Sequence, residues 1–303
     1  MRNTTSIGNK LSVNLAAAVK TVADHKPQAL TLEELVRAYD ATRNKTESER
    51  LRKWLSALGN LSAWEVTTEQ LSAAAQAMVD AGYKPSSPNR DLSALGSVYR
   101  WAMERRICPR GFRSPTMGVT RFKEDFRRVF MTDEEIETLR SRCLAWKDRR
   151  FSVYVWLLFD TGARKSEISL RRWSDVDMER REIRLATSKN GKPRVLHFSE
   201  ATKALILRVF PNRPEGGLIF EGKLPGSAIN YKAAWRRLVE DIGRTDLRQH
   251  DSRHIVAAGM LRNGVTLVVA AQVLGNTTAV LDARYGHLET ETLRKAVATQ
   301  WTH

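Results

Sequence analysis

The residues that could do chemistry together are gathered in five short segments of the C-terminal half. The segments are Thr-Gly-Ala-Arg-Lys-Ser-Glu at 161–167, Ser-Lys-Asn-Gly-Lys at 188–192, His-Asp-Ser-Arg-His at 250–254, Leu-Gly-Asn at 274–276 and Ala-Arg-Tyr-Gly-His at 283–287. Taken singly, each has an ordinary structural explanation, because an Arg in a helix is usually a surface charge and a Tyr near a chain end usually packs. Their order along the chain makes the series informative.

This series resembles the tyrosine site-specific recombinases of the phage-integrase type. The family's Thr-Gly-x-Arg-x-x-Glu segment is matched by 161–167, with its arginine at Arg164 and a Trp shortly afterwards, although the Leu before that Trp is displaced. The family's lysine is matched by Lys189, just before an Asn-Gly turn. Its His-x-x-Arg pair is matched by His250 and Arg253. Lys192 remains a competitor for the lysine's role.

The last two segments match the family's spacing but differ from the family in one residue, Asn276. The family's tyrosine comes nine residues after a His or Trp that follows Leu-Gly, and Tyr285 stands nine residues after Asn276. The amide of Asn276 can still donate a hydrogen bond to a phosphate oxygen, but it carries no charge and reaches less far than a ring. The departure predicts weakened, not absent, activity.

The resemblance implies a role for each matched residue. Attack on a DNA phosphodiester builds charge on the non-bridging oxygens, and the planar, permanently charged forks of Arg164 and Arg253 suit that charge. Tyr285 is the nucleophile, and with an ordinary pKa of about 10 it needs a base, which is assigned to His250. Lys189 is assigned as the acid that protonates the leaving 5′ oxygen.

Three further residues are expected to support this set. Glu167 lies three residues after Arg164 and is expected to orient it. His254 and His287 are expected to be structural or to support the reacting groups. The chain shows no Walker loop and no acidic pair suited to Mg²⁺, so we expect no metal and no cofactor. The bond energy would be kept in a phosphotyrosine, and rejoining would need no ATP.

The composition points to the same partner class. Lys and Arg total 50 against 34 acidic residues, giving a net charge of +16 and a sequence pI near 10.2. Such a chain favours a polyanion, here double-stranded DNA. The sequence shows no apolar run of membrane-spanning length and no signal segment, so we expect a cytoplasmic, nucleoid-associated protein without a membrane partner. Cys108 and Cys143 lack the spacing of a zinc or disulfide framework.

The predicted fold class is mainly α with a small β-sheet, in two domains. We assign 1–28 to a tail or arm, 29–112 to a helical core DNA-binding domain, 113–130 to a basic linker and 131–303 to an α+β catalytic domain. The resemblance makes the helical domain SAM-like.

Helical periodicity and capping signals predict the elements themselves. In the first domain, a helix begins at Thr31 and others cover 47–58, 68–81 and 88–106. In the second, a helix opens at Thr132, others cover 151–159, 165–170, 201–210, 228–242, 250–262, 266–274 and 290–300, and strands at 182–185 and 194–198 flank Asn190-Gly191 as a hairpin.

The chain between Arg100 and Phe130 has nine basic residues and three acidic ones. This balance fits either a solvated connection or one that crosses phosphates. By resemblance, the two domains and this linker close around the duplex as a clamp. The predicted DNA contacts are Arg100, Arg105, Arg106, Arg121, Lys123, Arg127 and Arg128.

By resemblance, the protein would work as a homotetramer on DNA, with a DNA-bending accessory protein as a possible helper. The C-terminal segment 290–301 has Leu293, Val297 and Trp301 at helical spacing. It could pack on its own domain or on a neighbouring protomer, and both alternatives stay open.

Rival functions differ in what they would do to DNA. A recombinase-derived binding protein, suggested by Asn276, would hold DNA without forming a covalent adduct. A type IB topoisomerase would relax supercoils without a partner site, and the short two-domain chain argues against it. A helical DNA-binding regulator would use Tyr285 only for packing, which the five ordered segments disfavour.

Overall fold

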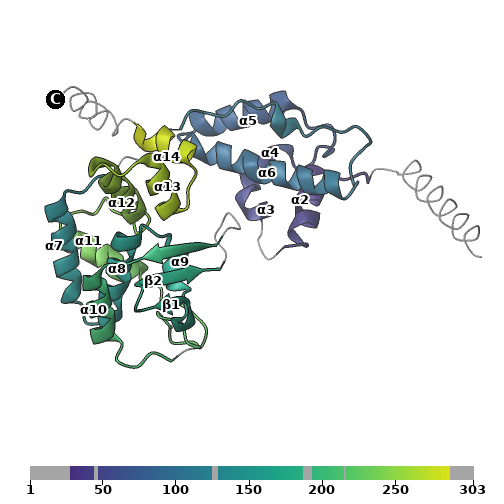
Figure 1. Ribbon diagram of the computed structural model, residues 1–303. Helices are drawn as coiled ribbons and strands as arrows, with labels where there is room; N and C mark the ends of the chain where they lie inside the picture. Colours follow the sequence, from purple (N-terminus) through teal and green to yellow (C-terminus); the bar gives the residue numbers. More distant parts are fainter. Residues whose placement is uncertain (1–27, 44–46, 125–128, 187–192, 215, 287–303) are drawn as a thin grey trace, which may run out of the picture. The chain divides into compact units, whose positions relative to one another are not determined.

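The computed structural model describes residues 28–43, 47–124, 129–186, 193–214 and 216–286. The chain divides into two compact units, 1–125 and 126–303, each with its own hydrophobic core. The described parts are mainly helical with one small sheet (Figure 1), which confirms the predicted fold class.

The first unit is a set of helices around a core in which Leu35, Trp54, Leu95 and Tyr99 are almost fully buried. Capping boxes at Thr31 and Thr67 satisfy the free N–H groups at two helix starts. The predicted helix 47–58 is divided at Leu51. The helices are α2 (Leu32–Asp40), α3 (Glu47–Arg50), α4 (Arg52–Leu58), α5 (Thr68–Asp80) and α6 (Ser86–Glu104), followed by the short 3-10 turn η1 (Pro115–Met117).

Residues 113–124 belong to the first unit, whereas the sequence analysis placed them in a linker. Val119 is buried in the core of the helices, and the Thr68 hydroxyl donates to the Pro115 carbonyl at 3.0 Å. Glycine and proline content predicted an irregular segment correctly, but apolar side chains and a buried asparagine, Asn89, hold that segment on the helices. The predicted boundary at 112 is therefore too early.

The second unit is organised around α8 (Arg149–Thr161), whose residues are apolar on nearly every side. The helices with the most extensive contacts to it are α7 (Asp133–Leu144), α10 (Glu200–Val209) and α12 (Asp251–Arg262). Aromatic rings of Phe151, Tyr154, Phe220 and Tyr231 meet in this core. The remaining helical elements are α9 (Lys165–Ser169), α11 (Lys232–Asp241), α13 (Leu267–Leu274), α14 (Thr278–Tyr285) and the turn η2 (Trp173–Asp175).

The sheet has three antiparallel strands in the order β1 (Val176–Asp177), β2 (Glu182–Leu185) and β3 (Arg194–His197). Ile183 lies opposite Leu196, and both are buried against the helical core. The predicted hairpin strands are thus present, while the Asn190-Gly191 turn between them lies outside the described residues.

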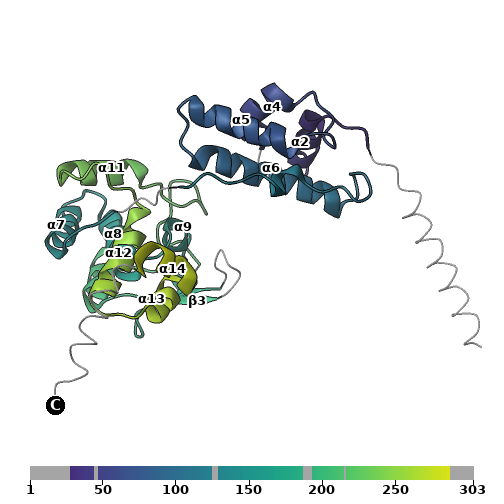
Figure 2. The ribbon, with the colours of Figure 1, turned by 90° about the horizontal axis from the view of Figure 1, so that it is seen from above.

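One helix of the second unit has no counterpart in the sequence analysis. α14 ends at Tyr285, and its start is capped by Thr277, whose hydroxyl accepts from the N–H of Val280. Thr277 and Thr278, followed by Ala, Val and Leu, form a capping signal that could have predicted this helix. α14 packs on α13, which packs on α12 (Figure 2). The helix predicted at 290–300 lies outside the described residues.

Candidate active site

Arg164 stands at the start of α9 and is held by Glu167. One Glu167 oxygen accepts from the Arg164 backbone N–H at 2.7 Å, and the other accepts from Nη1 of the same residue at 2.8 Å. The predicted orienting pair is therefore present in the geometry. Burial raises the pKa of Glu167, but the Arg164 N–H and the charge of Arg194 outweigh it, so the net pKa is lowered and the carboxylate is ionised at neutral pH.

Arg253 is buried in the first turns of α12, with 5% of its surface exposed. Its Nη1 donates to the Gly162 carbonyl at 2.9 Å, and Nη2 donates to the Leu274 carbonyl and, at 2.8 Å, to Oδ1 of Asn276. Burial and then the charges of Arg164 and Arg194 lower the pKa of Arg253 to about 10. The guanidinium remains protonated at neutral pH, in surroundings that already hold other cations.

Two glycines allow the backbone to turn around this guanidinium. Gly162 ends α8 with φ +57°, and Gly275 ends α13 with φ +63°, a region that favours glycine. A Cβ at Gly162 would lie 2.5 Å from Cδ2 of Leu274, so the two turns are in close contact. They bring the predicted Arg164, Arg253 and Asn276 into one neighbourhood.

The orientation of the Asn276 amide follows from its partner. An arginine can only donate, so the atom facing Arg253 must be the carbonyl oxygen Oδ1. The NH₂ group then lies on the other side of the amide. This is the donor that the sequence analysis assigned to a phosphate oxygen.

Arg194 is a residue that the sequence analysis missed. It opens β3, its side chain is 7% exposed, and its Nη2 lies 2.5 Å from Oε2 of Glu167. Glu167 thus pairs with two guanidinium groups, on Arg164 and Arg194, and Arg253 lies on the neighbouring carbonyl of Leu274, next to the Val273 carbonyl that Arg194 contacts. We call the three arginines and Glu167 the arginine cluster, and it carries an excess of two positive charges. An Arg before an alternating strand gives no sequence signal of its own.

Tyr285 is hydrogen-bonded to Nδ1 of His254. Burial raises the pKa of Tyr285 to about 12, against the lowering effect of Arg284 and Arg253. Burial and then Arg284 lower the pKa of His254 to about 4, so both partners are neutral at pH 7. A neutral His254 with its proton on Nε2 accepts the hydrogen bond from the tyrosine hydroxyl.

His250, the predicted base, stands one helical turn before His254, and the two rings meet edge to face at 5.7 Å between centroids. Partial desolvation of the ring and the charge of Arg253 lower the pKa of His250, although the residue as a whole is exposed. The histidine that contacts the tyrosine oxygen in the structure is His254. The sequence analysis had assigned the role of base to His250.

Several predicted residues lie outside the described part of the chain: Lys189, its competitor Lys192, His287, Arg127 and Arg128. The other predicted DNA contacts are exposed side chains of the first unit, namely Arg100, Arg105, Arg106, Arg121 and Lys123.

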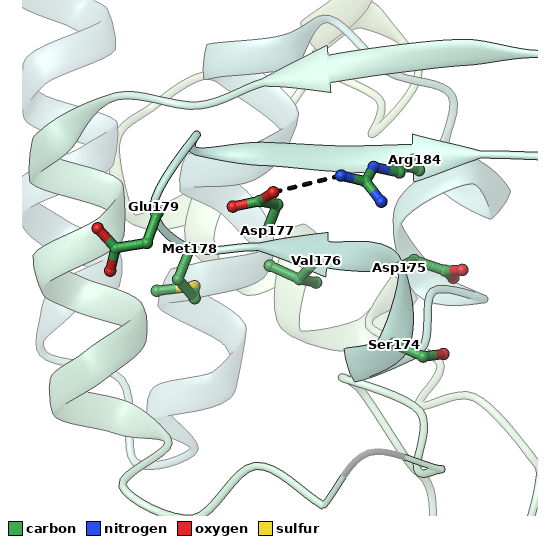
Figure 3. A pocket seen from close by; sticks show the side chains of 7 residues that line it. All are labelled: Ser174, Asp175, Val176, Asp177, Met178, Glu179 and Arg184. Carbon is green, nitrogen blue, oxygen red and sulfur yellow. Dashed lines mark hydrogen bonds and ion pairs between the residues drawn. The ribbon is translucent and has the colours of Figure 1, made fainter.

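A surface pocket of the second unit has a different character (Figure 3). It is lined by Ser174, Asp175, Val176, Asp177, Met178, Glu179 and Arg184. Asp177 pairs with Arg184 at 3.3 Å, and the lining holds none of the predicted site residues. Three of its side chains are acidic, which is unsuited to a phosphate.

No group of metal-binding side chains was found among the described residues. In the same part of the chain, no helix combines the length and apolar character needed to span a membrane.

Comparison with models of known protein families identifies the family of this chain. A model of the phage integrase family matches residues 129–292, and a model of the phage integrase N-terminal SAM-like domain matches residues 45–106. The chain belongs to the phage integrase family. Members of this family cleave and rejoin DNA, so the second unit is the part that corresponds to their catalytic domain.

Individual relatives agree with the family assignment. Tyrosine recombinase XerA of Saccharolobus solfataricus is 26% identical over 254 residues, covering 82% of this chain and 77% of the relative. The integrase of Escherichia phage P2 is 24% identical over 237 residues, covering 78% and 65% respectively.

The fold is shared with solved structures. The integrase of transposon Tn1549 in complex with circular intermediate DNA matches with a TM-score of 0.67 at 19% identity, over 89% of this chain and 99% of that one. A lambda integrase dimer bound to a core site matches with a TM-score of 0.62 at 15% identity, over 84% and 95%. At this level of identity the likeness concerns the fold.

Proposed function

We propose that this member of the phage integrase family carries out site-specific recombination through a covalent bond between DNA and the hydroxyl oxygen of Tyr285. The observation that carries the proposal is the arginine cluster beside this tyrosine. Tyr285 is hydrogen-bonded to His254, which follows Arg253 directly on α12. An excess of buried positive charge next to a nucleophile is the arrangement that a dianionic, five-coordinate phosphate requires.

In the cleavage step, the Tyr285 oxygen forms a bond to phosphorus while the bond from phosphorus to the 5′ oxygen breaks. The tyrosine proton passes to a histidine, and the departing oxygen takes a proton from an acid. The products are a 3′-phosphotyrosyl bond and a free 5′ hydroxyl. Attack by the 5′ hydroxyl of a partner strand reverses each transfer and rejoins the DNA, because the phosphodiester energy is retained.

Arg164 and Arg253 bind the non-bridging oxygens in this proposal. The NH₂ of Asn276, turned away from Arg253, donates to a further phosphate oxygen. Lys189 is the proposed acid on sequence grounds, with Lys192 as its alternative.

His254 is the proposed first acceptor of the tyrosine proton, because it is the group bonded to the hydroxyl. The pKa values oppose this transfer at rest, since Tyr285 lies near 12 and His254 near 4. The developing bond to phosphorus makes the phenol more acidic as the reaction proceeds, so the transfer belongs to the transition state. His250 is the alternative acceptor.

The proposed partner is double-stranded DNA, gripped by the exposed basic residues of the first unit together with the second unit. We further propose a homotetramer on DNA, because exchange between two duplexes cuts four strands and each cut uses one Tyr285. A mobile element is the proposed source of the target site, the nucleoid the proposed place of action, and a DNA-bending accessory protein a proposed helper.

The test is covalent trapping on nicked duplex DNA that carries the recombination site of the source element. Wild type should give a protein–DNA adduct on a denaturing gel, and Tyr285→Phe should give none. Tyr83→Phe, a change at an exposed tyrosine of the first unit, serves as the matched control and should behave as wild type. Asn276→His should raise the adduct yield if position 276 limits the reaction.

Other outcomes would replace the proposal. Binding of the site by every variant without any adduct would make the chain a DNA-binding protein. Relaxation of supercoiled plasmid that lacks the site, without strand exchange, would make it a topoisomerase.

A further inference from the structure

Arg194 contacts two elements at once with the two arms of its guanidinium. Nη2 pairs with Glu167 of α9 at 2.5 Å, and Nη1 donates to the Val273 carbonyl near the end of α13 at 2.9 Å. The residue itself belongs to β3, the strand that follows the segment containing Lys189 in sequence. One buried side chain therefore connects three elements of the second unit.

The two groups that Arg194 contacts each belong to a segment that also binds one of the proposed phosphate-binding arginines. Glu167 holds Arg164 through its backbone N–H and its side chain. The end of α13 holds Arg253, because the Leu274 carbonyl follows directly after Val273 and accepts from that guanidinium. Arg194 thus touches the partners of both arginines.

Arg194 packs tightly against the turn at Gly275. A Cβ at Gly275 would lie 2.8 Å from both Cδ and Nη1 of Arg194. The guanidinium therefore packs against the turn that precedes Asn276, in a space that only glycine leaves open. A contact this tight transmits a displacement of β3 to the turn, because packed interiors deform little.

We propose that Arg194 is a positioning residue for strand cleavage, which sets the separation of Arg164 and Arg253 by tying Glu167 to the end of α13. This inference rests on the proposed function of the site. It assigns Arg194 no contact with the phosphate, because its two arms are occupied by Glu167 and Val273. Its effect on the reaction passes through the two arginines that bind the substrate.

The chemistry of arginine suits this task better than that of lysine. A planar fork can serve two acceptors in fixed directions, whereas an ammonium is a single point on a flexible stem. Arg194 also balances Glu167, which would otherwise be left with Arg164 as its sole ion-pair partner in the described site. Removing Arg194 strengthens the hold of Glu167 on Arg164 and takes one positive charge from the cluster.

The experiment compares Arg194→Met and Arg194→Lys with Arg184→Met in the full-length protein. Arg184 is a matched control because it lies on the adjacent strand β2 and pairs with Asp177, which is only partly buried. Single-turnover cleavage of nicked site DNA is measured at saturating protein, and DNA affinity separately. We expect Arg194→Met to slow cleavage by about 10²-fold with affinity almost unchanged, as for a small misplacement of catalytic groups.

Arg194→Lys should recover part of the rate, because it restores the charge and one contact. Arg184→Met should cleave as wild type. A double-variant cycle gives the second readout: Glu167→Gln combined with Arg194→Met should slow cleavage no more than the worse single variant, because both act through the same link. If Arg194→Met does not fold, the Arg194→Lys rate and its cycle with Glu167→Gln decide the question.

Three results would overturn the proposal. These are wild-type cleavage rates in folded Arg194→Met and Arg194→Lys, losses of affinity as large as the losses of rate, or fully additive effects in the cycle. The proposed function stands or falls separately, since it depends on whether wild type forms an adduct that Tyr285→Phe lacks.

Discussion

Two buried polar networks, one around Asn89 in the first unit and the arginine cluster in the second, differ in the charge that they hold. In the first unit, the side chain of Asn89 donates to the Phe122 carbonyl at 2.9 Å and to Glu124 at 2.8 Å, and accepts from the Phe122 N–H at 3.0 Å. In the second unit, the carboxylate of Glu167 pairs with Arg164 and Arg194, and Arg253 brings a third guanidinium to the arginine cluster. In the network around Asn89, both the NH₂ group and the carbonyl oxygen of the amide have partners, and one of these partners, Glu124, is a carboxylate. The arginine cluster retains an excess of charge.

This difference in charge distinguishes a network that stabilises the fold from a cluster that takes part in the reaction. A satisfied amide network fixes a chain segment and leaves nothing for a ligand. Like charges buried together disfavour one another, so such a cluster persists where an anion of the reaction compensates it. Variants of the first kind should therefore change stability, and variants of the second kind should change cleavage.

The largest effect is expected for Arg253→Met. It removes the most buried guanidinium of the cluster, so cleavage of nicked site DNA should fall by at least about 10²-fold, the usual effect of losing one donor to a reacting oxyanion. DNA affinity should change little, because most of the grip comes from exposed basic residues. Single-turnover cleavage and a binding isotherm check this. Equal losses of rate and affinity would contradict the division of labour.

His254→Gln should have the next largest effect, about 10²-fold or more in the cleavage rate, since it removes the proton acceptor at Tyr285. His250→Gln is the matched comparison on the same helix. A larger defect in His250→Gln than in His254→Gln would return the role of the base to His250.

Asn89→Leu breaks the other side of the comparison. It removes the three hydrogen bonds of the Asn89 side chain and leaves its partners on Phe122 and Glu124 unpaired. The stability of the first unit should therefore fall by about 1–3 kcal/mol. The Phe122 amide should exchange hydrogen faster with solvent, while the cleavage rate at saturating DNA stays unchanged. Retention of wild-type exchange at Phe122 would show that Asn89 does not hold this segment.

The two units should also differ in their response to acid. Unfolded His has a pKa near 6.5 and folded His254 one of about 4, so between these values the unfolded chain binds a proton that the folded chain does not. The stability of the second unit should fall as the pH drops through this window. The first unit has one histidine, His25, outside the described residues. Melting temperatures at pH 7 and pH 5 for wild type and His254→Gln test this, and an equal drop in both proteins would contradict it.

The smallest effect is expected for exposed cations of the first unit. Arg105→Ala should reduce the slope of log affinity against log salt by about 0.9 if this side chain neutralises one phosphate. Its cleavage rate at saturating DNA should match that of wild type. An unchanged slope would remove Arg105 from the DNA contacts.

Much of the fold could be predicted from periodicity. Buried faces repeat at helical spacing, and Thr132 with Glu135 marks the start of α7 as expected. The extent of the first unit could not be predicted, because Pro115 and Gly118 signal an irregular chain without telling whether it packs. α14 was missed because Leu281 is its single buried residue, so its sequence shows no repeating apolar face.

The site was predictable where its residues form local patterns. Glu167 lies at capping-box spacing from Arg164, and the structure shows that pair. Arg194 could not be found in this way, because its partners Glu167 and Val273 are far away in sequence and meet it only through the folding of β3 onto α9 and α13. The choice between His250 and His254 likewise depends on where α14 places Tyr285.

The central claim is that Tyr285 becomes covalently joined to DNA beside the arginine cluster. The most direct measurement is mass spectrometry of the trapped adduct after digestion of protein and DNA. The account predicts one modified peptide, carrying a deoxynucleotide 3′-phosphate on Tyr285, in wild type and in Arg184→Met. A nucleotide attached to any other residue, or to a 5′ phosphate, would contradict it.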